Sequence, residues 1–151
     1  MTQARIISVN ISKDKGECKT PIEEGELRPE TGLVGDAHAG AWHRMLSLLA
    51  MESIETMRGK GADINPGDFA ENITTEGVIL HTLPVGTRMT LGDVEVEVTQ
   101  IGKECHQGCA IRQKIGDCVM PRQGIFVKVL NTGVVRAGDP VNVLSSGEGA
   151  A

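Results

Sequence analysis

The amino-acid sequence predicts a mainly β fold with one main helix. Glycine accounts for 19 of the 151 residues, a frequency that indicates many turns. The clearest strand pattern lies between Val94 and Thr99, where valine alternates with polar residues directly after the turn pair Gly92-Asp93. This pattern predicts a β-hairpin over residues 87–100 whose valines share one face of the sheet.

The first half of the chain predicts one strand and the main helix. Arg5–Ile11 is rich in β-branched residues and predicts a strand, and the polar stretch Ser12–Lys19 after it predicts a loop. Over Arg44–Met57 the residues of one face recur at i, i+3 and i+4, and Gly59 and Gly61 end the pattern. We expect this helix to lie over the sheet. Its buried face would consist of Leu46, Leu49, Ala50, Ser53, Ile54 and Met57.

The last part of the chain predicts a second hairpin and a final strand. The hairpin runs over Ile125–Val135, with Asn131-Thr132-Gly133 as its turn. Gly138-Asp139-Pro140 then turns the chain into a short strand, Val141–Leu144, because proline presets the turn dihedral and glycine relieves it.

Length and hydropathy bound the domain organisation and the compartment. A chain of 151 residues and 16.0 kDa supports one well-buried core, so we expect a single domain over residues 1–144 and a flexible tail over residues 145–151. The sequence has no apolar run of the length that a signal peptide or a membrane span needs. We therefore expect a cytoplasmic protein with no membrane partner.

Net charge and aromatic content argue against nucleic acid as a partner. The formal net charge is −5, and the chain has one Trp, two Phe and no Tyr. Nucleic-acid binding normally requires a basic field and aromatic stacking platforms. A small anionic ligand stays open, because a local cluster of cations can exist on an acidic protein.

The four cysteines, Cys18, Cys105, Cys109 and Cys118, are better explained as buried, catalytic or metal-binding residues than as two disulfides, since cytoplasmic thiols stay reduced. Cys105, Cys109 and Cys118 lack the two closely spaced ligand pairs that are typical of a structural zinc site. Cys109 and Cys118 are therefore interpreted as small core residues.

Cys105 has a different context from the other cysteines. It follows the valine-rich strand and is flanked by Lys103, Glu104 and His106. Neighbouring positive charge favours the thiolate, which is the form that attacks sulfur or binds a soft metal. Cys105 is thus the candidate reactive thiol.

Two further segments concentrate polar residues. "GLVGDAHAGAWHR" precedes the predicted helix, and "NPGDFAEN" lies on a turn-rich stretch. Ordinary loop chemistry is an alternative explanation for both, because Asp and Asn close turns and cap helices. The segments hold Asp36, His38, His43 and Arg44, and Asp68, Glu71 and Asn72, respectively.

The order of these motifs resembles the MOSC domain, which is found at the C-terminus of molybdenum cofactor sulfurase and in small standalone bacterial proteins. The resemblance runs from Ile6 to Val143. It rests on Gly35-Asp36-x-His38, on "PGDFAENITTEG", on the valine-rich strand that leads to Cys105, and on "GIFVKVLNTGVVRAGDPV".

The resemblance implies a strongly twisted β-barrel, of the MOSC or pyruvate-kinase-barrel type, with one main helix and short helical pieces. It also implies that Cys105 either carries sulfur as a persulfide or ligates the molybdenum of a bound molybdopterin. Several members of the family reduce N-hydroxylated compounds at that metal.

The favoured function is therefore molybdenum cofactor (molybdopterin) binding with sulfur or metal handling through Cys105, in cofactor maturation, sulfuration or delivery. A molybdenum-dependent reductase of N-hydroxylated compounds is one alternative. A zinc or iron–sulfur module that uses Cys105, Cys109 and Cys118 is another. The expected protein partners are a cysteine desulfurase, which is a pyridoxal phosphate enzyme, or a molybdoenzyme.

The candidate cofactor-binding residues are those that the motifs place before the helix, before the next strand and around Cys105. Cations among them would neutralise the cofactor's phosphate. The set is Asp36, His38, Arg44, Asn72, Lys103, Arg122 and Lys128, with Cys105 as the catalytic residue and metal ligand.

The hairpin register gives a first test. Val96→Asp should unfold the domain, because it buries an unpaired charge, whereas Glu97→Lys should be tolerated on the opposite face. Chemical denaturation of both variants measures the difference. Equal stability of the two variants would show that the register is wrong.

Overall fold

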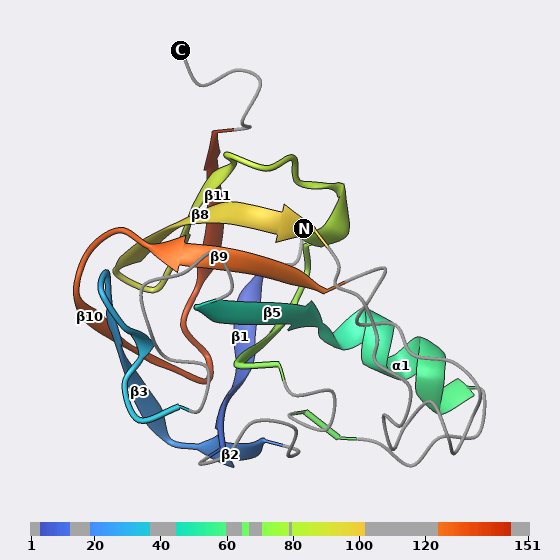
Figure 1. Ribbon diagram of the computed structural model, residues 1–151. Coiled ribbons are helices and arrows are strands. Elements are labelled where there is room, and N and C mark those ends of the chain that lie inside the picture. Colours follow the sequence, from blue (N-terminus) through green and yellow to red (C-terminus); the bar gives the residue numbers. More distant parts are fainter. Residues whose placement is uncertain are drawn as a thin grey trace, which may run out of the picture.

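The computed structural model describes residues 4–12, 19–36, 45–59, 65–66, 71–78, 80–101 and 124–145. Most of the described residues lie in strands (Figure 1). In chain order the elements are β1 (Arg5–Ile11), β2 (Thr20–Ile22), β3 (Glu24–Arg28), β4 (Gly32–Leu33), β5 (Leu46–Ala50), the helix α1 (Met51–Gly59), β6 (Ile73–Glu76), the short 3-10 helix η1 (Leu80–Thr82), β7 (Arg88–Leu91), β8 (Val94–Ile101), β9 (Ile125–Val129), β10 (Gly133–Arg136) and β11 (Val141–Ser145).

Eight of the strands form one strongly curled sheet. The strand order is β11-β7-β8-β9-β5-β6-β1-β2, and a smaller sheet has the order β10-β3-β4. The large sheet curls until β1 meets the turn before β11. Ile6 N–H donates to the Asp139 carbonyl at 2.8 Å, and Gly138 N–H donates to the Ile6 carbonyl at 2.7 Å. The predicted mainly β, barrel-like fold is confirmed.

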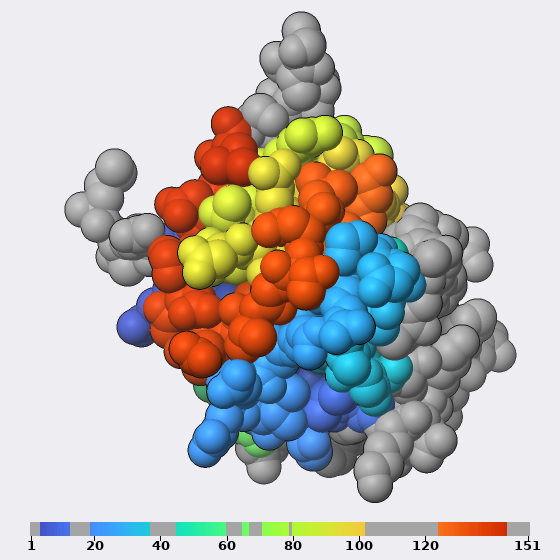
Figure 2. All heavy atoms as spheres, turned by 90° about the vertical axis from the view of Figure 1, so that its left-hand side faces the viewer, coloured from blue at the N-terminus to red at the C-terminus, as the bar shows by residue number. Residues whose placement is uncertain are grey.

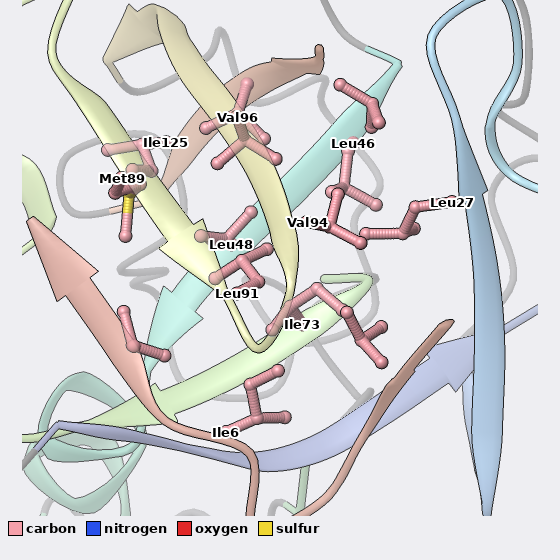
Figure 3. Packing of buried hydrophobic residues seen from close by; sticks show 14 of the residues in the cluster. Ile6, Leu27, Leu46, Leu48, Ile73, Met89, Leu91, Val94, Val96 and Ile125 are labelled. Atoms are coloured by element: carbon pink, nitrogen blue, oxygen red, sulfur yellow. The ribbon is translucent and has the colours of Figure 1, made fainter. Parts of the chain in front are cut away.

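The inner face of the curl holds one hydrophobic core. Figure 3 shows side chains of β7 and β8, such as Met89 and Val96, in the same cluster as Leu48 of β5 and Ile6 of β1. These residues are 0–1% exposed. Burial of apolar surface on this scale is the main favourable contribution to folding.

The hairpin predicted from the valine alternation is confirmed. Leu91 pairs with Val94, so Gly92 and Asp93 form the two-residue turn. Gly92 has φ 61°, a conformation that glycine adopts without strain. Along β8 the burial alternates as predicted, with valines buried and glutamates half-buried.

The predicted helix was wrong in its first part. Leu46–Ala50 forms β5, and helix α1 covers only Met51–Gly59. All five residues of β5 are buried, because the strand lies in the middle of the sheet between β9 and β6. A strand buried on both faces has a continuous apolar pattern, which periodicity cannot distinguish from a buried helix.

Helix α1 also does not lie over the sheet as predicted. It follows directly on β5 and lies beyond the end of that strand (Figure 1). Ile54 and Met57 are fully buried but are not part of the main core cluster. The Glu52 carboxylate in the first turn accepts a hydrogen bond from Gly77 N–H at 2.9 Å, which joins the helix to the end of β6.

The second predicted hairpin was also wrong. β9 pairs with β8 and β5, and β10 pairs with β3, so the two predicted arms do not pair with each other. Asn131 instead forms hydrogen bonds to the hairpin of β7 and β8. Its side-chain oxygen accepts from Glu95 N–H at 2.6 Å, and its amide donates to the Asp93 carbonyl at 3.3 Å.

The smaller sheet joins distant parts of the sequence. Figure 2 shows residues of the β3 and β4 region, in blue, side by side with residues of the C-terminal strands, in orange and red. The turn at Gly138, with φ 96°, leads into β11 as predicted. Ser145 belongs to that strand and residues 146–151 lie outside the described residues, so the division into a 1–144 domain and a flexible tail stays a prediction.

Two neighbouring threonines of β6 provide a stability test. Thr75 Oγ1 is buried and has no hydrogen-bond partner among the described residues, whereas Thr74 Oγ1 donates to Glu71 Oε2 at 2.7 Å. Thr75→Val should raise the free energy of unfolding by about 1 kcal/mol, because an unsatisfied buried hydroxyl is removed. Thr74→Val should lower it by about 1–3 kcal/mol. Urea unfolding of both variants measures the contrast, and a destabilised Thr75→Val protein would contradict the assignment.

Candidate functional site

The first strand and the residue directly after it carry polar side chains on a buried face. Ser8, Asn10 and Ser12 are 7%, 0% and 8% exposed. They alternate with Val9, which belongs to the hydrophobic core, and with the partly buried Ile11. Because every second residue of a strand shares a face, the three polar residues form one stripe. Polar groups buried this deeply need hydrogen-bond partners.

Asn10 joins this stripe to the start of β6. Its amide donates to the Glu71 carbonyl at 3.2 Å and to Thr74 Oγ1 at 3.1 Å, and its side-chain oxygen accepts from the Ser8 hydroxyl at 2.6 Å. The Glu71 carboxylate, in a residue that is 0% exposed, accepts from Thr74 Oγ1. A carboxylate is thus held inside the protein next to amide and hydroxyl groups.

Asn72 extends the network to β5. Its side-chain oxygen accepts from Ser47 N–H at 3.0 Å, and Asn72 N–H donates to Ser47 Oγ at 3.0 Å. On its other side, the Asn72 amide donates to the Asn10 carbonyl at 3.4 Å. One residue therefore joins β1 to β5 across the start of β6.

Lys19 and Asp36 form a fully buried ion pair. Both side chains are 0% exposed, and Lys19 Nζ lies 2.8 Å from Asp36 Oδ1. Ser12 takes part twice: its N–H donates to the same carboxylate oxygen at 3.1 Å, and its hydroxyl accepts from Lys19 Nζ at 3.0 Å. The pair thus continues the polar stripe of β1.

We call this set the buried polar layer. It contains two carboxylates, two amides, several hydroxyls and one ammonium group, all in residues that are 8% exposed or less. The groups bond to one another and to the backbone, so the layer holds the neighbouring strands in defined positions. The layer consists of Ser8, Asn10, Ser12, Lys19, Asp36, Ser47, Glu71, Asn72 and Thr74.

The sheet brings both ends of the cysteine-bearing segment to this layer. Ile101 pairs with Ile125, Ile125 with Leu48, and Leu48 with Ile73, which forms one row across four neighbouring strands. Residues 102–124 connect the first two members of this row. Asn72 directly precedes Ile73 at one end of the row, and Cys105 is four residues after Ile101 at the other end.

The structure brings two of the predicted site residues together and leaves a third apart. Asp36 and Asn72 both belong to the buried polar layer. Lys128 is half-exposed on β9, and its ammonium lies 3.6 Å from the Glu97 carboxylate. The other predicted residues lie outside the described residues: His38, Arg44, Lys103, Cys105 and Arg122, as well as Cys109 and Cys118.

Most of the layer was not predicted from the sequence. The alternation of Ser8, Asn10 and Ser12 with apolar residues was visible, but such a pattern ordinarily indicates a solvent-facing side of a strand. Lys19 belongs to the polar stretch Ser12–Lys19, whose composition predicted a solvent-exposed loop. The one sign of burial in the sequence is that the polar side chains of the stripe are short and uncharged. A strand face exposed to water more often carries charged residues.

Two further properties concern the described residues alone. Within the described ranges, no group of three or more His, Cys, Asp and Glu side chains is arranged to hold a metal ion. The described helices include none with the length and apolar character to cross a membrane.

A family model for the MOSC domain matches residues 35–142. The chain belongs to the MOSC domain family, which is associated with molybdenum cofactor binding and sulfuration. The match covers Asp36, Asn72 and the whole cysteine-bearing segment.

Several solved structures share the fold. The YUAD protein from Bacillus subtilis superposes with a TM-score of 0.77 at 19% identity, over 94% of this chain and 96% of its own. YiiM from Geobacillus stearothermophilus gives 0.73 at 22% identity, over 94% of this chain and 75% of its own. YiiM from Escherichia coli gives 0.67 at 20% identity, over 96% and 71%. The search of curated proteins found no match.

Mutation can distinguish the buried environment of Asn72 from the exposed environment of Lys128 by the effect on the free energy of unfolding. Asn72→Ala should lower the free energy of unfolding by about 1–3 kcal/mol, because the buried Ser47 N–H loses its acceptor. Lys128→Ala should change it by less than about 1 kcal/mol, since exposed ion pairs contribute little. Denaturant unfolding provides both values. A similar loss in the two variants would contradict the assignment of Asn72 to the buried layer.

Proposed function

We propose that this protein binds the molybdenum cofactor, molybdopterin, and handles sulfur or metal through Cys105 during cofactor maturation, sulfuration or delivery. Membership of the MOSC family, which is associated with this cofactor, supports the cofactor class. One observation about this chain supports the role of Cys105. The segment that carries it begins and ends on the strand row that adjoins Asn72 and the buried polar layer.

The described residues would support a cofactor site without contacting the ring themselves. The amides of Asn10 and Asn72 are buried and bond to neighbouring strands, so they would hold the strands beside a bound pterin in fixed positions. The phosphate requires additional cations, since Lys19 is matched by Asp36 within the layer. We propose His38, Arg44, Lys103 and Arg122 for that role, with Lys128 at the margin.

When bound, the cofactor supplies a molybdenum centre that a soft thiolate can ligate. The chain's own contribution is the thiol of Cys105. In sulfur transfer its thiolate attacks the outer sulfur of a cysteine desulfurase persulfide. A new S–S bond then forms on Cys105, and the desulfurase cysteine leaves as a thiolate, so that no external oxidant is consumed.

The proposed protein partners follow from this chemistry. A cysteine desulfurase supplies the sulfur, and a molybdoenzyme receives the matured cofactor. Both partners work in a reducing cytoplasm, where thiols and persulfides persist. The proposal includes no membrane or nucleic-acid partner.

Substitution of single cysteines tests the proposal. Cys105→Ser should abolish persulfide formation and molybdenum retention, because a hydroxyl neither carries sulfane sulfur nor binds molybdenum as a thiolate does. Cys109→Ser and Cys118→Ser are the matched controls and should retain both properties. The measurements are persulfide labelling and metal analysis with pterin fluorescence, on protein purified without air.

Two results would overturn the proposal. Retention of cofactor and persulfide by Cys105→Ser would exclude this thiol as the functional group. Equal loss of bound zinc or iron in all three variants, with no pterin in the parent protein, would favour a metal module instead.

A further inference from the structure

The outer face of the three-stranded sheet is open to water. The inner face of this sheet packs into the hydrophobic core through Leu27, Leu33 and Val135. Successive residues of a strand point to opposite faces, so the residues between these three point outward. Figure 2 shows the β3 and β4 region, in blue, side by side with the C-terminal strands, in orange and red. The outward residues are Glu24, Glu26 and Arg28 of β3, Val34 directly after β4, and Val134 and Arg136 of β10.

Two valines on this face lie in one row with Glu26. Val134 pairs directly with Glu26 across β10 and β3. On the other side, Val34 N–H donates to the Glu26 carbonyl at 3.0 Å. The two valines are 42% and 41% exposed, and a row across three strands places them roughly 10 Å apart. Since the solvated face of an antiparallel sheet is normally polar, this row indicates a surface that another molecule can cover.

The charges on either side of this row have opposite signs along β3. Glu24 lies two residues before Glu26, and Arg28 lies two residues after it. Within the chain, Arg28 bonds to the Glu26 carboxylate, and Arg136 Nη2 lies 3.7 Å from Glu24 Oε2. The four side chains are 38–60% exposed. Two carboxylates and two guanidinium groups make the face neutral, although the whole chain has a formal net charge of −5.

This pattern is complementary to itself. A second copy can be placed face to face by a two-fold axis that lies along the row of Val134, Glu26 and Val34. The two β3 strands then run in opposite directions, so that Glu24 of each copy faces Arg28 of the other, and each valine faces its own counterpart. The two Glu26 carboxylates approach each other at the axis, where each is bonded to Arg28 of its own chain.

We propose that the outer face of the sheet β10-β3-β4 is a dimer interface whose occupant is a second copy of this chain. A different protein would have to supply both charges in the right order, whereas a second copy supplies them by symmetry. Six outward residues bury less than the roughly 1,200 Å² at the lower end of stable interfaces, so the dimer is weak and reversible. The dimer does not depend on cofactor binding.

Charge reversal at the two ends of β3 tests the axis. In Glu24→Arg two positive side chains face each other at both ends of the contact, and in Arg28→Glu two negative side chains do so. Each variant alone should lose about tenfold or more in dimer affinity. A mixture of the two variants restores opposite charges at both ends. A heterodimer should therefore form in the mixture with an affinity close to that of the parent.

Sedimentation velocity over a concentration series measures the dimer as a species of twice the chain's 16.0 kDa. A reducing agent in the buffer prevents disulfides between copies, and circular dichroism checks that each variant is folded. Arg88→Glu is the matched control for Arg28→Glu. The two arginine side chains are 51% and 48% exposed, and Arg88 lies 3.5 Å from the Glu95 carboxylate on the large sheet. This control should dimerise as the parent does.

A second variant tests the apolar part of the face without changing an ion pair. Val134→Lys places two ammonium groups near the axis and should lower dimer affinity about tenfold or more. Val85→Lys is its control, because Val85 is also exposed, at 57%, but does not belong to the three-stranded sheet. This pair of variants decides the proposal if a charge-reversed variant does not fold.

Three results would each overturn the proposal. The first is a parent protein that stays monomeric at about 1 mM, where a complex with a micromolar Kd is largely formed, and this result would leave the face to a different protein. The second is a parent dimer that persists in both charge-reversed variants and in Val134→Lys, which would put the interface elsewhere. The third is loss of the dimer in both charge-reversed variants with no recovery in their mixture, which would exclude the two-fold arrangement.

Discussion

The closure of the curled sheet is the constraint on which the other features depend. Backbone hydrogen bonds between Ile6 and the turn at Gly138 and Asp139 join the first strand to the last part of the chain. Once this contact forms, the inner face of the sheet is removed from water, and the valine, leucine and isoleucine side chains fill it. The closure also determines the position of β1, whose other face carries the buried polar stripe.

The outer face of β1 shows how the fold supports a site at some cost in stability. Asn10 is buried on this face and Asn72 is buried at the start of β6, and each makes several hydrogen bonds to neighbouring segments. Such bonds add little net free energy over the solvated state, but their loss is expensive. The network is therefore better at defining the relative positions of β1, β6 and β5 than at stabilising them. Defined positions are what a binding site requires.

The sequence was sufficient to predict the fold class and one hairpin register, because a period of two is unambiguous when valines alternate with glutamates. It was insufficient for Leu46–Ala50, since full burial removes the alternation that identifies a strand. It was also insufficient for the pairing of β10. The local turn residue Asn131 bonds to the other hairpin, and this depends on contacts that only the folded chain makes.

Only part of the buried polar layer had a local sequence signal. Asp36 and Asn72 lie in short motifs with several turn residues, and these motifs identified them as candidates, whose functional role stays a prediction. Lys19 lies in a polar stretch, and nothing in the neighbouring residues distinguishes a buried lysine from a solvated one. Its burial follows from Asp36, which is 17 positions away in the sequence. Long-range pairing of this kind is not visible in a local pattern.

The pairing of Ile101 with Ile125 has a consequence for how this protein can change. The two residues are neighbours in the sheet, so the chain between them begins and ends at nearly the same place. The sheet therefore imposes almost no length or composition on that insert, since the cost of closing a loop grows only slowly with its length. The sheet and the segment between Ile101 and Ile125 are therefore independent in sequence: changes within that segment need not alter the strand register on either side of it.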